Sequence, residues 1–337
     1  MAHSFAMQQI HPAKNRDWTA LASAGPLNSM HSLSSQPPLQ TFIWHLAADA
    51  TVVLALVAAT QRLSSARVET PKLDSEVLLA AVLGCNRAQL YAYPERLLSA
   101  EERSRFEHLV VRRFQHEPVA YLVGEKAFYG LDFYVDRRVL IPRPETELLV
   151  DLLLDVILQQ DEDTSPSAPR LVVADIGAGS GAVSVAVAAN TQKTLVYAID
   201  ISADALAVAR SNAARHRLQQ RIHFLHGNLL EPLPEQADVI VANLPYVASH
   251  EWQDLAPGIV NYEPTQALLG GSDGLDSIRG LLQQAPVHLK PGGVVLLEVG
   301  SSQGAAVAEA ARAGFPNALI EVLTDYAFRE RIVRIQT

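Results

Sequence analysis

The stretch Leu171–Gly181, LVVADIGAGSG, decides the fold of this chain. It begins with a continuous apolar run, which is typical of a strand buried on both faces of a parallel sheet. The run ends in a glycine-rich turn, and the small residues from Ala182 onward predict a helix. A strand, a glycine turn and a helix in this order indicate an α/β domain whose ligands bind at the carboxyl ends of the strands.

The rest of the C-terminal half continues this alternation of strands and helices. Apolar runs predict the strands, and the amphipathic segments between them predict the helices. Strands are expected at 195–199, 222–225, 238–242 and 292–299, with two closing strands near 318–323 and 331–335, and helices at 203–216 and 303–313. The predicted fold class is therefore α/β, with a parallel, doubly wound sheet.

The N-terminal half has a helical pattern instead. The run VVLALVAATQRL from Val52, the segment LDSEVLLAAVLG that ends at Gly84, and residues 100–114 all have helical periodicity. Short loops join them, so they predict a small helical-bundle domain at 46–120. Residues 1–45 are rich in Ser, Gln, Pro and His, and they predict a disordered leader.

A short segment connects the two halves. Aromatic and β-branched residues around Gly130 fit no helical period, so residues 121–143 predict a β-hairpin linker. Two prolines follow, and an amphipathic helix is expected from Glu145 onward. The α/β domain then comprises residues 144–337. The helical domain contains no nucleotide-binding motif, so we expect it to recognise the substrate.

Composition limits the classes of function. The net charge of −9 is unfavourable for a protein that binds nucleic-acid phosphates, so we expect no stable nucleic-acid binding. A single cysteine, Cys85, excludes an intramolecular disulfide framework and suits a cytoplasmic setting. The apolar stretch Thr41–Thr60 contains His45 and Asp49, so we interpret it as a buried helix and expect no membrane span.

The glycine turn predicts a site for a ligand that contains a nucleoside. Glycines permit a tight turn and let a ligand approach the backbone, while the helix that follows presents free N–H groups. Asp200 ends the next predicted strand, where its carboxylate can accept hydrogen bonds from ribose hydroxyls. The spacing also fits the dinucleotide fingerprint, so NAD remains an alternative. The expected contacts in the turn are Gly177, Ala178, Gly179, Ser180 and Gly181.

The tetrapeptide Asn243-Leu244-Pro245-Tyr246 ends the predicted strand 238–242 and suggests a second site. Methylation of a planar amide nitrogen needs its N–H groups held by acceptors, because the lone pair of such a nitrogen is delocalised. The side-chain oxygen of Asn243 and the backbone carbonyl of Leu244 can each accept one N–H. Pro245 stiffens the turn, and Tyr246 offers a flat surface to the planar group. Such catalysis relies on positioning and electrostatics.

With these motifs in place, the chain resembles the PrmC/HemK family of protein-(glutamine-N5) methyltransferases. The resemblance extends from about Leu73 to Arg331 and includes the helical segment ending at Gly84, IPRPETELL, DIGAGSGAVS, the YEP of Tyr262–Pro264 and PGGVVLLEVG. It implies a Rossmann-like methyltransferase domain and S-adenosyl-L-methionine (AdoMet) as cofactor. It also implies, as substrate, the glutamine in the Gly-Gly-Gln loop of class I peptide chain release factors.

The same resemblance assigns roles to particular residues. Asn243 is expected to contact both the cofactor and the substrate, and the residues after the third strand, Asn228 and Leu229, to contact the adenine edge. The family usually has aromatic or acidic residues at those two positions and proline at the position of Leu244. A backbone carbonyl is the acceptor there, and leucine supplies it as proline does.

Two other functions remain open at this point. Asn-Leu-Pro-Tyr also occurs in ribosomal RNA adenine dimethyltransferases, so a nucleic-acid adenine N6 methyltransferase is the first alternative. An NAD-dependent oxidoreductase, or a binding protein without catalysis, is the second. No metal is expected, because His223 and His226 lie three apart on a predicted strand and point to opposite faces. We expect a cytoplasmic monomer.

Overall fold

The computed structural model describes residues 44–160 and 170–337. Most of the leader predicted for residues 1–45 therefore lies outside the described residues. Residues 44–337 form one compact unit, which contains a helical N-terminal part and a larger part built on a sheet.

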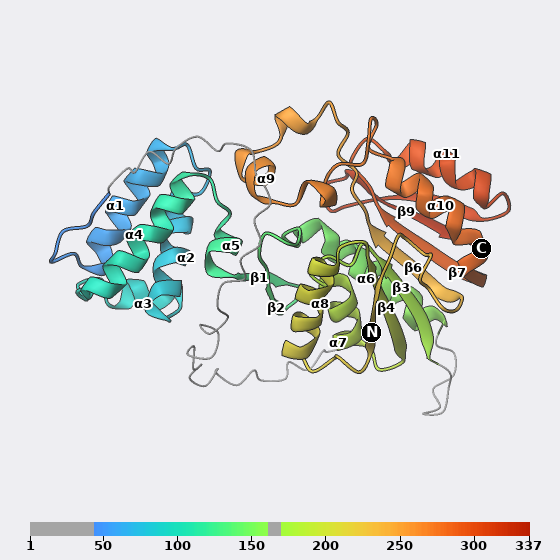
Figure 1. The fold of residues 1–337 in the computed structure, drawn as a ribbon, viewed down its shortest axis with the longest axis horizontal. Helices are drawn as coiled ribbons and strands as arrows, with labels where there is room; N and C mark the ends of the chain where they lie inside the picture. Colours follow the sequence, from blue (N-terminus) through green and yellow to red (C-terminus); the bar gives the residue numbers. More distant parts are fainter. Residues whose placement is uncertain (1–43, 161–169) are drawn as a thin grey trace, which may run out of the picture. The chain divides into compact units, whose positions relative to one another are not determined.

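The N-terminal part is a bundle of five helices around its own apolar core (Figure 1). Gly84 ends the second helix as predicted, in the left-handed conformation with φ of 63°, and Ser99 caps the fourth. The third and fifth helices were not predicted, because five or six residues are too few for periodicity to show. The bounds are α1 Val52–Ser65, α2 Pro71–Leu83, α3 Arg87–Ala92, α4 Ala100–Phe114 and α5 Val119–Val123.

The helix predicted over Thr41–Thr60 is wrong in its first half. Residues 44–50 are not helical, and α1 begins at Val52. Thr51 explains the start, because its hydroxyl accepts a hydrogen bond from the Leu54 N–H and so caps the first turn. Within the part of the chain that the structure describes, none of the helices is long and apolar enough to span a bilayer.

The hairpin is present where it was predicted. β1 (Glu125–Phe128) and β2 (Leu131–Tyr134) pair antiparallel, and the aromatic side chains of Phe128 and Phe133 are buried in the core beside the large sheet. Asn212 joins this hairpin to the glycine turn Gly177–Gly181. Its side chain accepts a hydrogen bond from the Tyr134 N–H and donates to the carbonyls of Tyr134 and Ser180.

Seven strands form the large sheet, in the order β5-β4-β3-β6-β7-β9-β8. Every predicted strand is present. The prediction of an entirely parallel sheet is wrong for one strand. β9 runs antiparallel to both β7 and β8. The short turn 325–329 between β8 and β9 forces this direction, since parallel neighbours need a longer crossover. The bounds are β3 Leu171–Ile176, β4 Thr194–Asp200, β5 Ile222–His226, β6 Ala237–Asn243, β7 Leu289–Glu298, β8 Leu319–Thr324 and β9 Glu330–Gln336.

Helices cover both faces of the sheet, as a doubly wound fold requires (Figure 1). Along β3, Val173 faces one layer of helices, while Val172 and Ala174 face the other. The first layer contains α6 Glu147–Gln160, α7 Ala182–Asn190 and α8 Ala203–Arg215, and the second contains α10 Asp276–His288 and α11 Gly304–Gly314. Residues before α6 form a 3₁₀ turn, Pro144–Thr146, in place of the first turn of the predicted helix.

The segment between β6 and α10 was not predicted. It has short elements, η3 Trp252–Asp254, α9 Pro257–Tyr262 and η4 Thr265–Ala267, and it leads into α10. None of the three is longer than six residues, so the sequence shows no period there. This segment contributes to the site described next.

Candidate active site

The glycine turn between β3 and α7 has the strained backbone that only glycine adopts easily. Gly177, Gly179 and Gly181 all have positive φ, between 55° and 78°. Beneath the turn, the buried carboxyl of Asp175 accepts hydrogen bonds from the backbone N–H and the hydroxyl of Ser184 at 3.0 and 2.5 Å. Burial raises the pKa of Asp175 to about 6. These contacts hold the turn against the start of α7.

Asp200 ends β4 beside this turn. Its two carboxylate oxygens each accept a backbone N–H at 2.8 Å, one from Gly179 and one from Ser202. Burial raises the pKa of Asp200, and these hydrogen bonds oppose the increase. Each carboxylate oxygen has a second lone pair, so Asp200 can hold the turn and still accept hydrogen bonds from hydroxyl groups of a ligand.

Asn228 and Leu229 follow β5 at the same edge of the sheet. The Gly227 N–H donates to the Asp200 carbonyl at 3.1 Å, which places these two residues next to the predicted ribose contact. The side-chain amide of Asn228 donates to Glu231 at 3.0 Å, and Leu229 has a positive φ of 50°. Their contact with the adenine remains a prediction.

The tetrapeptide lies directly against the glycine turn. A Cβ atom on Gly177 would lie 3.1 Å from a methyl carbon of Leu244 and 3.4 Å from the carbonyl oxygen of Asn243. The two predicted sites therefore adjoin, because strands β3 and β6 are neighbours and both end at this edge. The spacing of the two motifs in the sequence could not reveal this contact.

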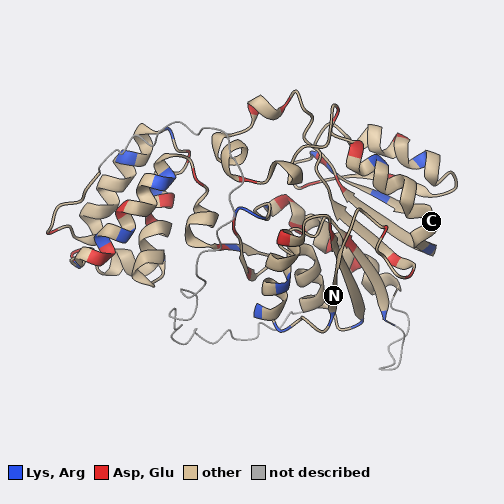
Figure 2. Cartoon of the chain, viewed as in Figure 1, with Lys and Arg blue, Asp and Glu red and all other residues tan. Residues whose placement is uncertain are grey.

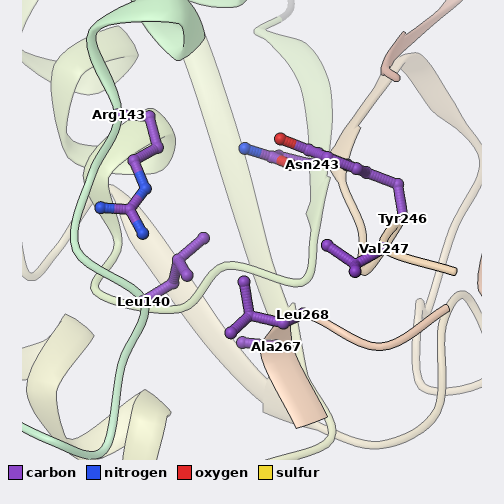
Figure 3. Close-up of a pocket in the computed structure, with 7 residues that line it drawn as sticks. All are labelled: Leu140, Arg143, Asn243, Tyr246, Val247, Ala267 and Leu268. Atoms are coloured by element: carbon purple, nitrogen blue, oxygen red, sulfur yellow. The ribbon is translucent and has the colours of Figure 1, made fainter. Parts of the chain in front are cut away.

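Two of the four predicted substrate residues, Asn243 and Tyr246, also line one pocket, whereas Leu244 and Pro245 are not part of its lining. Figure 3 shows Leu140 and Arg143 on one side of it and Asn243, Tyr246 and Val247 on the other. Ala267 and Leu268 complete the lining and come from the segment that was not predicted. Burial also raises the pKa of Tyr246.

An ion pair between the part-exposed Arg143 and the buried Glu263 holds the IPRP segment at this pocket. Glu263 is buried, and its carboxylate accepts the Ile141 N–H at 3.1 Å and pairs with Arg143 at 2.5 Å. Glu263 was not among the predicted site residues, although it belongs to the YEP motif. A glutamate flanked by Tyr262 and Pro264 gives no local sign of a partner 120 residues away.

Loop 270–274 packs closely against the backbone of the tetrapeptide. A Cβ atom on Gly270 would lie 2.5 Å from the carbonyl oxygen of Pro245, and one on Gly274 would lie 2.6 Å from the side-chain nitrogen of Gln303. That nitrogen donates to the Tyr246 carbonyl at 2.9 Å. This loop was not predicted, although the three glycines in GGSDG indicate a turn or loop at this position.

The geometry fits AdoMet. The turn has glycine where a ligand must approach the backbone, and Asp200 retains acceptor capacity for ribose hydroxyls. The adjoining pocket is lined by Asn243 and Tyr246, an amide and an aromatic side chain that suit a planar amide substrate. A cofactor held by the turn would therefore lie beside the residues predicted to hold the group that accepts its methyl.

Comparison with known proteins gives the family. Residues 55–124 match the PrmC N-terminal domain, and residues 151–268 match the methyltransferase small domain. The chain is 39% identical to the release factor glutamine methyltransferase of Koribacter versatilis over 75% of this chain and 87% of that protein. It is 40% identical to the Moorella thermoacetica protein of the same name, over 83% of this chain and 96% of that protein. The chain belongs to the release factor glutamine methyltransferase family.

Proposed function

We propose that this chain transfers a methyl group from AdoMet to the side-chain amide nitrogen of the glutamine in the Gly-Gly-Gln loop of class I release factors. The relatives that this chain matches over most of their length are release factor glutamine methyltransferases. The observation that carries the proposal is the position of Asn243 and Tyr246 in a pocket that adjoins the glycine turn.

In this proposal the protein acts by orientation. AdoMet supplies an electrophilic methyl group when bound at Gly177–Gly181 and Asp200. The side-chain oxygen of Asn243 and the carbonyl of Leu244 accept the two N–H groups of the substrate amide, which directs its nitrogen toward the cofactor site. Tyr246 provides a flat surface for the amide plane. These groups are held in place before the substrate arrives, so they need little reorganisation during the reaction.

The remaining parts of the proposal concern partners and location. The helical domain, residues 46–120, recognises the release factor, and the enzyme acts as a cytoplasmic monomer. Figure 2 shows acidic and basic residues interspersed over the described part of the chain. With a net charge of −9, this distribution does not favour stable binding to nucleic acid.

The test is a methylation assay on an intact release factor. The protein and labelled AdoMet are incubated with purified release factor, and the modified peptide is identified by mass spectrometry. We expect one methyl group on the glutamine of Gly-Gly-Gln, and none on a release factor with glutamate at that position. Label on another residue of the release factor, or no label on the release factor, would contradict the proposed substrate.

Asp200→Ala tests the cofactor site. We expect AdoMet binding to weaken by about 1–3 kcal/mol, because hydroxyl groups lose an acceptor and the Gly179 N–H loses its partner. Isothermal titration calorimetry measures the change. Asp204→Ala is the matched control, since Asp204 is exposed in the first turn of α8, and it should bind AdoMet like the wild type. Equal affinity for AdoMet in the Asp200 variant would remove Asp200 from the site.

A further inference from the structure

Glu298 is a buried carboxyl beside the predicted catalytic asparagine. It is the last residue of β7, it is 1% exposed, and it pairs in register with Asn243 on the neighbouring strand β6. Among the described residues, its buried Oε2 atom has no hydrogen-bond partner. A carboxyl in such a place is costly unless other groups satisfy it.

Thr146 connects Glu298 to Asn243. The side-chain nitrogen of Asn243 donates to the Thr146 hydroxyl oxygen at 3.1 Å. The Thr146 hydroxyl and the Asn243 amide also face Glu298, and both lower its pKa. Because the hydroxyl oxygen accepts a hydrogen bond from Asn243, its own proton is available to donate to Glu298, which when ionised only accepts.

This arrangement decides which end of the Asn243 side chain faces the substrate. The oxygen and nitrogen of an asparagine amide occupy nearly the same space, so packing alone does not distinguish the two orientations. Two inward acceptors, the Thr146 oxygen and the Glu298 carboxylate, both require the nitrogen on their side. The oxygen is then left for the substrate N–H.

We propose that Glu298 is a positioning residue that acts through Thr146 to hold Asn243 with its side-chain oxygen toward the substrate amide. This inference rests on the proposed function. It also explains why three motifs distant in the sequence occur together, since Thr146 lies in IPRPETE, Asn243 in the tetrapeptide and Glu298 in LLEVG.

The surroundings of Glu298 make the effect depend on pH. The pKa of Glu298 is raised to about 7, mainly by burial and also by the Glu145 charge, against the opposing effect of the Arg331 charge. Tyr246 also faces this carboxyl and contributes no charge near neutral pH. Above pH 7 the ionised carboxylate of Glu298 only accepts hydrogen bonds. Below pH 7 the protonated carboxyl can donate a hydrogen bond to Thr146, and it then no longer specifies the orientation of Asn243. Activity should therefore fall as the pH decreases through about 7.

Glu298→Gln is the main test, because it keeps the shape and removes the charge. We expect kcat to fall about tenfold or more, with unchanged KM for AdoMet, and the decrease in activity near pH 7 to disappear. In an Asn243→Ala background the same change should have no further effect. Asp238→Asn, at the opposite end of β6, is the matched control and should keep the wild-type rate.

The thermal stability of the variants distinguishes a positioning role of Glu298 from a structural role. The folded-state pKa of Glu298 lies above its ordinary value of 4.5, so its contribution to stability is lost as the pH rises through about 7. Glu298→Gln should therefore have a Tm at pH 8 no lower than that of the wild type. Thr146→Val should also lose activity, and Thr146→Ser, which keeps the hydroxyl, should recover most of it.

The outcomes are distinguishable from failure of the proposed function. Wild-type enzyme that methylates no glutamine contradicts the proposed function, whereas an unchanged rate in Glu298→Gln, or a loss that adds to that of Asn243→Ala, overturns the positioning role. The NMR signals of the Asn243 side-chain amide provide a readout without turnover. They should shift with pH near 7 in the wild type and not in Glu298→Gln, and a signal independent of pH in both proteins overturns the inference.

Discussion

Asn243→Ala should lower kcat for glutamine methylation at least about a hundredfold while AdoMet affinity stays nearly unchanged, which is the scale for losing one preorganised polar contact. The side chain lines the substrate pocket, and its nitrogen is already held by Thr146 at 3.1 Å. Its oxygen therefore contributes only when the substrate amide is present. Single-turnover methylation of a release factor measures the loss, and calorimetry measures the affinity for AdoMet.

Two further variants identify the reason for that loss. Asn243→Asp keeps an acceptor for the substrate N–H and should retain measurable activity. Leu244→Pro restores the usual residue of the family and should change the rate only modestly, because the backbone carbonyl is unchanged. If Asn243→Ala methylates at the wild-type rate, the amide-orienting mechanism is wrong.

Gly270→Ala should lower kcat by roughly a hundredfold, although glycine has no side chain that could take part in the reaction. The new methyl group would lie 2.5 Å from the Pro245 carbonyl oxygen, so loop 270–274 or the tetrapeptide must move. A displacement of about 1 Å at a reacting group costs about that factor. Gly270 does not have a positive φ, so backbone strain contributes little and the effect comes from space alone.

The matched control is Gly314→Ala at the end of α11. There a Cβ atom would lie 3.1 Å from the Leu282 carbonyl oxygen, a tight but tolerable distance, and the residue is remote from the pocket. We expect it to methylate release factor at nearly the wild-type rate. Steady-state kinetics on both variants, with circular dichroism to confirm folding, makes the comparison. A normal kcat in Gly270→Ala would show that the loop does not position the tetrapeptide.

Residues from four separate motifs form the site. Arg143 and Thr146 come from the segment before α6, Asn243 from the end of β6, Glu263 from α9's C-terminal side, and Glu298 from the end of β7. Hydrogen bonds join Arg143 to Glu263 and Asn243 to Thr146. The family pattern therefore corresponds to one connected structure and not to a set of independent contacts.

Much of the fold could be predicted from local patterns. The strands of the large sheet are buried, so their apolar runs are nearly continuous, and the caps at Ser99 and Gly84 depend only on neighbouring residues. The glycines at 177, 179 and 181 were predicted for the same reason, since a turn with positive φ is a local requirement. The alternatives of NAD and nucleic-acid adenine remained open because both sequence motifs occur in other enzymes, and similarity over most of the chain supplied the family.

The sequence by itself determined the elements whose cause is local: apolar runs, helix caps, the glycine turn and the tetrapeptide at a strand end. Only the tertiary structure decided the antiparallel β9, the contact of Gly177 with Leu244, and the partners of Glu263 and Glu298. The physical reason is that the hydrogen-bond and charge partners of a buried polar group are residues that the fold places beside it, which can be distant in the sequence. Glu298 and Asn243 are 55 residues apart in the chain, and they meet because β6 and β7 are neighbours in register.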